Sequence, residues 1–321
     1  MKLAEQEFSA EHAARPGLIP VQLDAVRRTA LWLDLNGYHC YDGSFRRALA
    51  TYAAIRAGGR HPSQPWQCRS SLDFLSSGAY TAGCMNPTGF IFHAGRCGST
   101  LLAKAIARSQ EHMVFGEGGP HNQIWRVVSG ERASAPVLFR NLLLHMGRRR
   151  LPTYRAHIVK FTSFNILQFE IIRAAFPDVP ALFLFRQPGQ ILASYERGAP
   201  GWMGRDTGIA TIRHSAKEAV TDFFQAALLA GRNLTCLDYA DLTPETLPGI
   251  LRVFHLDPPA ADLEAMREEF NWDAKSNSVR AHRPAAVSGS EPAVPRALHA
   301  LYEELSARKA DFTDSVVKCF A

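Results

Sequence analysis

The sequence predicts an α/β fold in which helices flank a central parallel sheet. The first observation is a set of short apolar runs, at 90–93, 157–161 and 180–185, with the composition of strands buried on both faces. The second is that segments with the apolar spacing of amphipathic helices lie between these runs. Alternation of the two patterns is typical of a parallel sheet whose strands are connected by helices.

The first 85 residues are expected to form a mainly helical extension that packs on a core formed by 86–321. Apolar spacing predicts one helix over 21–33, and Ser44 is expected to cap a second helix over 45–57. Besides packing on the core, the extension could cover a substrate or mediate a homodimer, and the sequence does not choose between these roles.

Composition is that of a globular protein, with 46% hydrophobic and 21% charged residues. The net charge of +6 favours a polyanionic partner, which could be a nucleotide, a nucleic acid or an anionic glycan. Six cysteines show neither a CxxC pair nor metal-ligand spacing, so we expect reduced thiols and no metal. Neither a signal peptide nor a membrane-spanning run is evident, so we expect a cytoplasmic protein without a membrane partner.

A short loop after the first core strand is the candidate anion site. It aims backbone N–H groups and the positive end of a helix dipole at one point, which suits phosphate or sulfate. It departs from an ATP or GTP loop of the Walker type, because Ser99 stands where that pattern requires Lys and the charge has moved to Arg96. The loop residues are Gly95, Arg96, Cys97, Gly98, Ser99 and Thr100.

The next predicted strand, 111–115, is followed by Glu117 between glycines. The carboxyl end of a strand is where parallel α/β sheets bind ligands, so Glu117 is a candidate general base. His121 is a rival, since His suits that role near neutral pH, but it is expected in the first turn of the following helix.

Two basic features come next. A predicted helix over 136–147 ends in three arginines at 148–150, which we expect to form a solvated cluster. The strand at 157–161 places Lys160 near its end, where the side chain could simply point to solvent.

The apolar strand at 180–185 precedes Arg186, and Pro188 suits the first turn of a helix that carries Ser194. An arginine can fork onto a phosphate while a hydroxyl fixes its orientation. Farther along, 198–208 lacks periodicity and is a candidate substrate loop, and 234–242 predicts the last core strand.

These motifs together resemble sulfotransferases that use 3′-phosphoadenosine-5′-phosphosulfate (PAPS), with the site pattern closest to the tyrosylprotein and bacterial branches. The resemblance covers about 89–285 and implies a P-loop-type fold. Residues 96–100 match the loop that binds the 5′-phosphosulfate in this family, which has a basic residue, a small residue, Gly and two hydroxyl residues. Cys97 replaces the commoner Ser at the small position. The implied roles are 5′-phosphosulfate binding by 95–100, general base for Glu117, contact with the leaving phosphate oxygen and sulfate for Lys160, and 3′-phosphate binding by Arg186 and Ser194.

The resemblance also implies that the polar segment 271–284 closes over the 3′-phosphate, with Arg280 as a contact. The expected reaction moves a sulfuryl group from PAPS to a hydroxyl of a small molecule, glycan or peptide, without a metal and without a nucleic-acid partner. Two alternatives remain open at this point. One is an ATP-dependent small-molecule phosphotransferase, and the other is a non-catalytic nucleotide- or polyanion-binding protein of the same fold.

Overall fold

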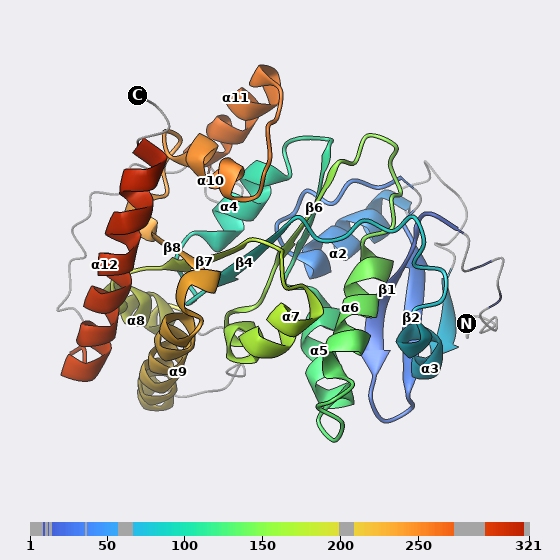
Figure 1. The fold of residues 1–321 in the computed structure, drawn as a ribbon, viewed down its shortest axis with the longest axis horizontal. Coiled ribbons are helices and arrows are strands. Elements are labelled where there is room, and N and C mark those ends of the chain that lie inside the picture. Colours follow the sequence, from blue (N-terminus) through green and yellow to red (C-terminus); the bar gives the residue numbers. More distant parts are fainter. Residues whose placement is uncertain are drawn as a thin grey trace.

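A five-stranded parallel sheet forms the centre of the protein (Figure 1). The structure is a computed structural model, which describes residues 9, 12, 15–35, 37–56, 67–198, 209–272 and 293–317. The strand order is β5-β6-β4-β7-β8, so that β4 is central. The bounds are β4 Gly89–His93, β5 His112–Gly116, β6 Ala156–Lys160, β7 Ala181–Phe185 and β8 Thr235–Asp238.

Helices cover both faces of this sheet, which confirms the predicted architecture. One face contacts α4 (Ser99–Ile106), α10 (Leu247–Val253) and α11 (Ala260–Glu268). The other face contacts α6, α7, α8 and α9, and α12 packs against β8 and α9. Bounds of these five are α6 Ala135–Met146, α7 Phe169–Ala175, α8 Pro188–Glu196, α9 Ile209–Leu229 and α12 Arg296–Val317.

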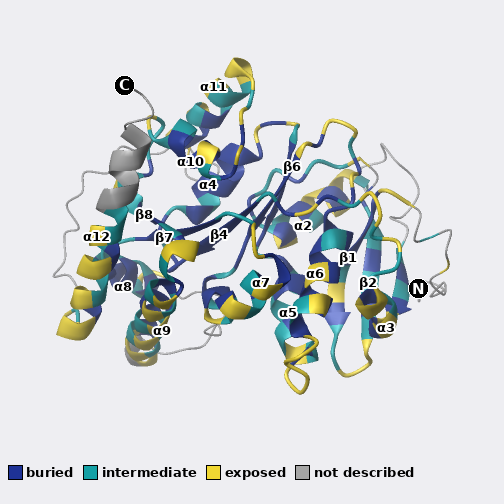
Figure 2. Ribbon diagram, in the orientation of Figure 1, coloured by how far each residue is buried: buried dark blue, intermediate teal, exposed yellow. Residues whose placement is uncertain are grey.

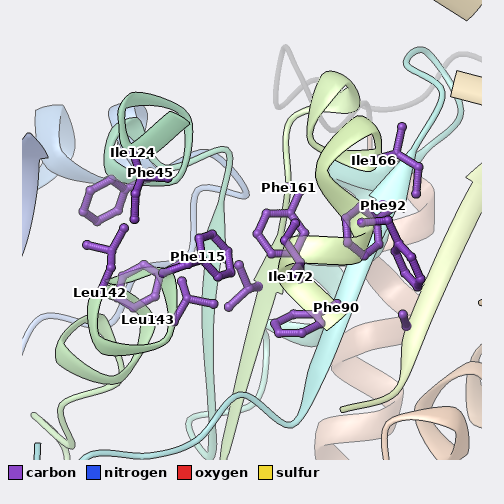
Figure 3. Packing of buried hydrophobic residues seen from close by; sticks show 14 of the residues in the cluster. Phe45, Phe90, Phe92, Phe115, Ile124, Leu142, Leu143, Phe161, Ile166 and Ile172 are labelled. Carbon is purple, nitrogen blue, oxygen red and sulfur yellow. The ribbon is translucent and has the colours of Figure 1, made fainter. Parts of the chain in front are cut away.

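The strands are buried along almost their whole length (Figure 2) because successive side chains enter different cores. Phe90 and Phe92 of β4 enter a core rich in phenylalanine, and Ile91 between them enters the core beneath α4. The Phe92 ring stacks on Phe161 with centroids 4.8 Å apart (Figure 3). This packing fixes the carboxyl end of β4, from which the candidate loop emerges.

The N-terminal extension differs from the prediction, since its described part is not mainly helical. It forms a three-stranded antiparallel sheet of β1 (Leu18–Asp24), β2 (Thr29–Asp34) and β3 (Gln67–Ser71). The helix expected over 21–33 is therefore wrong. The second expected helix is confirmed as α2 (Phe45–Ile55), for which Ser44 is the N-cap residue.

The segment 21–33 does not form a helix because it contains a turn, which the apolar spacing alone does not reveal. Asp24 ends β1, and its carboxylate accepts the backbone N–H groups of Val26 and Arg27, which closes a hairpin instead of a helical turn. Trp32 then lies fully buried in β2, where its indole N–H donates to Ser70 Oγ of β3 at 2.8 Å. Partners from separate strands decide the structure of this segment.

Two of the three arginines expected to be solvated are buried. Arg149 is exposed, whereas Arg148 and Arg150 are 5% and 7% exposed. Arg148 donates to the carbonyl of Arg15, and Arg150 to that of Tyr38 at 2.8 Å. The segment folds inward because these guanidinium groups meet carbonyls of the extension, and they thereby bind the extension to the core.

Further contacts hold the extension beside the candidate site. Strand β1 packs on α5 (Gly119–Val127), and the Leu23 N–H donates to Gln123 Oε1 at 2.7 Å. The carbonyl of Gly43 lies so close to Gly116 that a Cβ atom there would be 2.1 Å from it. The remaining elements are α3 (Leu72–Ser77) and the 3-10 helices Ser163–Gln168, Gly231–Asn233, Tyr239–Asp241 and Glu269–Asn271.

No helix within the described residues is both long and apolar enough to cross a membrane. Most of the expected substrate loop, 199–208, and most of the polar segment, 273–284, lie outside the described residues.

Candidate active site

Four side chains selected from the sequence lie at the carboxyl edge of the parallel sheet. Arg96 follows β4, Glu117 follows β5, Lys160 ends β6 and Arg186 follows β7. Because the strands are parallel, their carboxyl ends form one edge, where α/β folds bind ligands. The strand order places Glu117 and Lys160 on one side of the loop and Arg186 on the other.

The loop between β4 and α4 has a tightly curled backbone. Gly95, Arg96 and Gly98 have φ angles of +86°, +55° and +79°. A curl of this kind followed by a helix N-terminus makes a concave site for an anion. The first N–H groups of α4, which begins at Ser99, have no acceptor within the helix. The donor set of this loop therefore fits a phosphate or sulfate group.

Protein side chains, and not only a ligand, require the two loop glycines. A Cβ atom on Gly95 would lie 2.0 Å from Tyr195 Oη, and one on Gly98 would lie 2.8 Å from Tyr239 Cδ2. Glycine also lets a loop backbone turn sharply and approach a ligand closely. The structure adds that two tyrosines pack directly against the loop and hold its shape.

The thiol of Cys97 faces the core. Its Sγ donates to the Leu184 carbonyl at 3.2 Å, and the residue is fully buried. Burial raises the pKa of this thiol to about 12, so it stays protonated at neutral pH. The backbone of Cys97 belongs to the loop, but its side chain does not reach the ligand face.

Glu117 and Lys160 form an ion pair at the end of the sheet. Lys160 Nζ contacts Glu117 Oε1 and lies 3.5 Å from Thr100 Oγ1 of the loop helix. The Lys160 side chain is 0% exposed, whereas that of Glu117 is 36% exposed. The Glu117 backbone, with φ of +51°, donates to the Lys160 carbonyl at 2.8 Å. This geometry presents the carboxylate to solvent and keeps the ammonium beneath it.

The electrostatics of the pair keep Glu117 ionised. Burial by itself would raise the pKa of Glu117, but the Lys160 ammonium and the nearby His93 ring outweigh burial and lower the pKa well below its ordinary value. A carboxylate held in this way is a weak base while Lys160 is its partner. It becomes a stronger base when the ammonium turns toward another anion.

Arg186 and Ser194 stand where the sequence placed them, after β7 and within α8. Arg186 Nη1 donates to the Arg96 carbonyl at 3.2 Å, and its Nε donates to Gln190 Oε1 at 2.6 Å. Its guanidinium lies 4.5 Å from the centroid of the Tyr239 ring. Partial burial lowers the Arg186 pKa from its very high ordinary value, and the group remains a cation at neutral pH.

Arg96 carries its charge across the mouth of the loop. Its Nη2 donates to the Gly198 carbonyl, two residues beyond α8, and its guanidinium lies 5.5 Å from the centroid of the Tyr195 ring of that helix. The loop, α8 and Arg186 are thus linked to one another. Together they form a basic edge that suits an anion with two charged groups.

The rival base, His121, is fully buried in α5 and is not accessible to an acceptor. Burial lowers its pKa to about 3. The proposed contact Arg280 lies outside the described residues. Within the part of the chain that the structure describes, no group of three or more His, Cys, Asp or Glu side chains is placed to hold a metal ion.

Sequence reasoning missed three neighbours of the site. They are Tyr239, His93 and Gln190, none of which was among the candidate site residues. Tyr239 directly follows a core strand at the edge where ligands bind, and this position in the sequence could have predicted that it lies near the site. The contacts of His93 and Gln190 depend on side-chain directions that spacing does not give.

No protein family model and no curated protein matches the chain. Among solved structures, it is similar to the sulfotransferase domain from the Synechococcus PCC 7002 olefin synthase, with 16% identity, a TM-score of 0.44, and coverage of 69% of this chain and 94% of that one. It is also similar to the sulfotransferase domain from the curacin biosynthetic pathway, with 13% identity, a TM-score of 0.47, and coverage of 70% and 98%. A third is sulfotransferase STF1 from Mycobacterium tuberculosis H37Rv, with 15% identity, a TM-score of 0.42, and coverage of 73% and 83%.

Proposed function

We propose that the protein transfers a sulfuryl group from PAPS to a hydroxyl group of an acceptor. The observation that carries this proposal is the Glu117–Lys160 pair beside an anion-binding loop. It combines a solvent-accessible carboxylate with a buried cation at the position where a transferred group would lie. The carboxylate can accept the proton of an acceptor hydroxyl, and the cation can stabilise the negative charge on the sulfuryl oxygens and on the leaving phosphate oxygen.

In the proposed reaction, Glu117 removes the proton from the acceptor oxygen as that oxygen attacks sulfur. The new sulfur–oxygen bond forms while the bond between sulfur and the phosphate oxygen breaks, and the phosphate leaves with the electron pair. Lys160, Arg96 and N–H groups of the loop stabilise negative charge on the sulfuryl and leaving oxygens. No metal is required, because these cations supply the charge.

Arg186 and Ser194 are proposed to hold the 3′-phosphate of the donor. Arg186 lies beside the loop and is partly buried, so a hydrogen bond to a phosphate there is strengthened by limited access of water. A 3′-phosphate distinguishes PAPS from ATP. This assignment therefore favours a sulfotransferase over an ATP-dependent phosphotransferase.

Calorimetric binding of 3′-phosphoadenosine-5′-phosphate (PAP) tests the donor assignment. Wild type should bind PAP more tightly than ATP or AMP, with no need for magnesium. Arg186→Ala should bind PAP about 10- to 100-fold more weakly, since a hydrogen bond to a charged group contributes about 1.5–3 kcal/mol. Arg149→Ala, at an exposed arginine far from the loop in sequence, is the matched control and should bind normally.

Turnover tests the base. Glu117→Gln should retain PAP binding and lose formation of PAP from PAPS in the presence of an acceptor. Tighter binding of ATP with magnesium would refute the proposal and favour a phosphotransferase. Selective PAP binding without turnover on any phenol, alcohol or sugar would favour a non-catalytic binding protein.

A further inference from the structure

His93, the last residue of β4, contacts three separate parts of the candidate site. Its Nδ1 accepts the backbone N–H of Gly95 in the loop at 3.0 Å. Its Nε2 lies 2.9 Å from the carbonyl of Phe161 and 3.7 Å from Glu117 Oε1. The side chain is 7% exposed. His93 takes no part in the proposed reaction as described above.

These contacts define the protonation of the imidazole. Because Gly95 donates to Nδ1, that nitrogen carries no proton, and the ring proton lies on Nε2. The Nε2–H group then donates to the Phe161 carbonyl at 2.9 Å, and the Glu117 carboxylate lies 3.7 Å from Nε2, beyond hydrogen-bond distance but close enough for an electrostatic attraction. Burial and the nearby Lys160 ammonium lower the pKa of His93, against the opposing effect of Glu117, so the ring is neutral.

Lys160 and His93 approach the same carboxylate oxygen, Glu117 Oε1. Glu117 and Lys160 are the charged groups that face the imidazole. In the proposed reaction the Lys160 ammonium is needed on the sulfuryl oxygens, and Glu117 then loses its strongest partner. The His93 ring cannot turn toward the donor as Lys160 does, because its hydrogen bonds with Gly95 and Phe161 hold the ring at both nitrogens.

We propose that His93 is a positioning residue that holds the Glu117 carboxylate in place when Lys160 turns toward the donor, and that it couples this carboxylate to the shape of the loop. This inference rests on the proposed sulfuryl transfer. His93 touches neither donor nor acceptor in this scheme, and it acts through Glu117 on one side and Gly95 on the other.

Two substitutions separate the two ends of the ring. His93→Asn places an amide where Nδ1 lies, so it can still accept the Gly95 N–H, but it does not reach Glu117. His93→Gln places its amide where Nε2 lies, so it can donate toward Glu117 and Phe161 but loses the bond to Gly95. The side chains differ by one methylene group, which makes each the control for the other.

The expected results differ in kind. His93→Asn should bind PAP within about threefold of wild type and should form PAP from PAPS about 10- to 100-fold more slowly, since small misplacement of a reacting group has effects of this size. His93→Gln should keep more of the turnover rate and bind PAP more weakly. Turnover is measured with 2-naphthol as the probe acceptor and with water alone.

Nitrogen-15 NMR of histidine-labelled protein tests the inference without an acceptor. Wild-type His93 should show a proton on Nε2 and none on Nδ1, and both Glu117→Gln and the addition of PAP should shift the Nε2 signal. A proton on Nδ1, or an Nε2 signal that ignores both changes, would overturn the positioning role.

Other outcomes separate this inference from the proposed function. If wild type binds PAP selectively and consumes PAPS while His93→Asn is as fast as wild type, the positioning role is wrong and the function stands. Equal losses of PAP binding and turnover in both variants would show a merely structural role. If wild type fails to bind PAP, the proposed function fails and the inference fails with it.

Discussion

The burial of the Glu117–Lys160 pair is unequal, and this predicts unequal effects of removing each partner. The Lys160 side chain is 0% exposed and that of Glu117 is 36% exposed. Glu117→Gln leaves a buried ammonium with neutral partners, which are the new amide and Thr100 Oγ1. Lys160→Met leaves a carboxylate that water can still hydrate and that lies 3.7 Å from His93 Nε2.

Removal of one partner of a buried pair costs about 3–5 kcal/mol of unfolding free energy. We expect about 2–3 kcal/mol for Glu117→Gln, below that range because the amide still accepts a hydrogen bond and the pair is partly solvated. We expect at most about 1 kcal/mol for Lys160→Met, since methionine fills the buried space. The double variant should be about as stable as Lys160→Met.

Urea unfolding of the four proteins at pH 7.5 measures these differences, and the double-mutant cycle isolates the pair. Lys160→Met should also raise the Glu117 pKa, because the ammonium is what offsets the effect of burial. In wild type this group stabilises the fold above its ordinary pKa, and that contribution is lost as pH falls through the lowered value. The reasoning is refuted if Lys160→Met is the more damaging change, or if the two effects simply add.

Three further predictions concern the framework of the site. Arg150→Ala should lower the unfolding free energy by about 2–4 kcal/mol, because it removes a buried side chain that binds the extension to the core. Arg149→Ala, at an exposed position, should change it by less than about 0.5 kcal/mol. Thermal unfolding compares the two variants, and equal effects would contradict the importance of the buried contact. Gly95→Ala should lower the unfolding free energy, because its Cβ would lie 2.0 Å from Tyr195 Oη and because φ at this position is +86°. Adding Tyr195→Phe should recover the part caused by the clash and leave about 1–2 kcal/mol of backbone strain. If urea unfolding shows no recovery, the Tyr195 hydroxyl is not the obstacle. Burial lowers the pKa of His157 to about 3, below the value near 6.5 of an unfolded chain, so its contribution is fully present above pH 6.5 and is lost as pH falls toward 3. His157→Leu should flatten the pH dependence of stability between pH 6.5 and 5 by about 1.1 kcal/mol per pH unit on average, and an unchanged slope would show that the ring is solvated.

Part of the site was predictable because chain order and strand polarity are enough to assemble it. In a parallel sheet the residue after each strand reaches the same edge, so Arg96, Glu117, Lys160 and Arg186 could be placed together from the order of apolar runs. Pro188 likewise marked the start of α8, and Ser44 the start of α2. These signals are local and do not depend on distant partners.

The sequence by itself determined the strand–loop–helix alternation, the buried parallel sheet and the gathering of charged residues at its carboxyl edge. Tertiary structure decided the rest, because the deciding partners are far apart in the chain. The spacing of Val21 and Leu33 fits a helix or a hairpin, and the hydrogen bond from the Trp32 indole to Ser70 of the distant strand β3 forms only with the hairpin. The burial of Arg150 depends on a carbonyl 112 residues away, and the link from His93 to Phe161 spans 68 residues. Such contacts form only once the sheet has brought the segments together, so no local pattern encodes them.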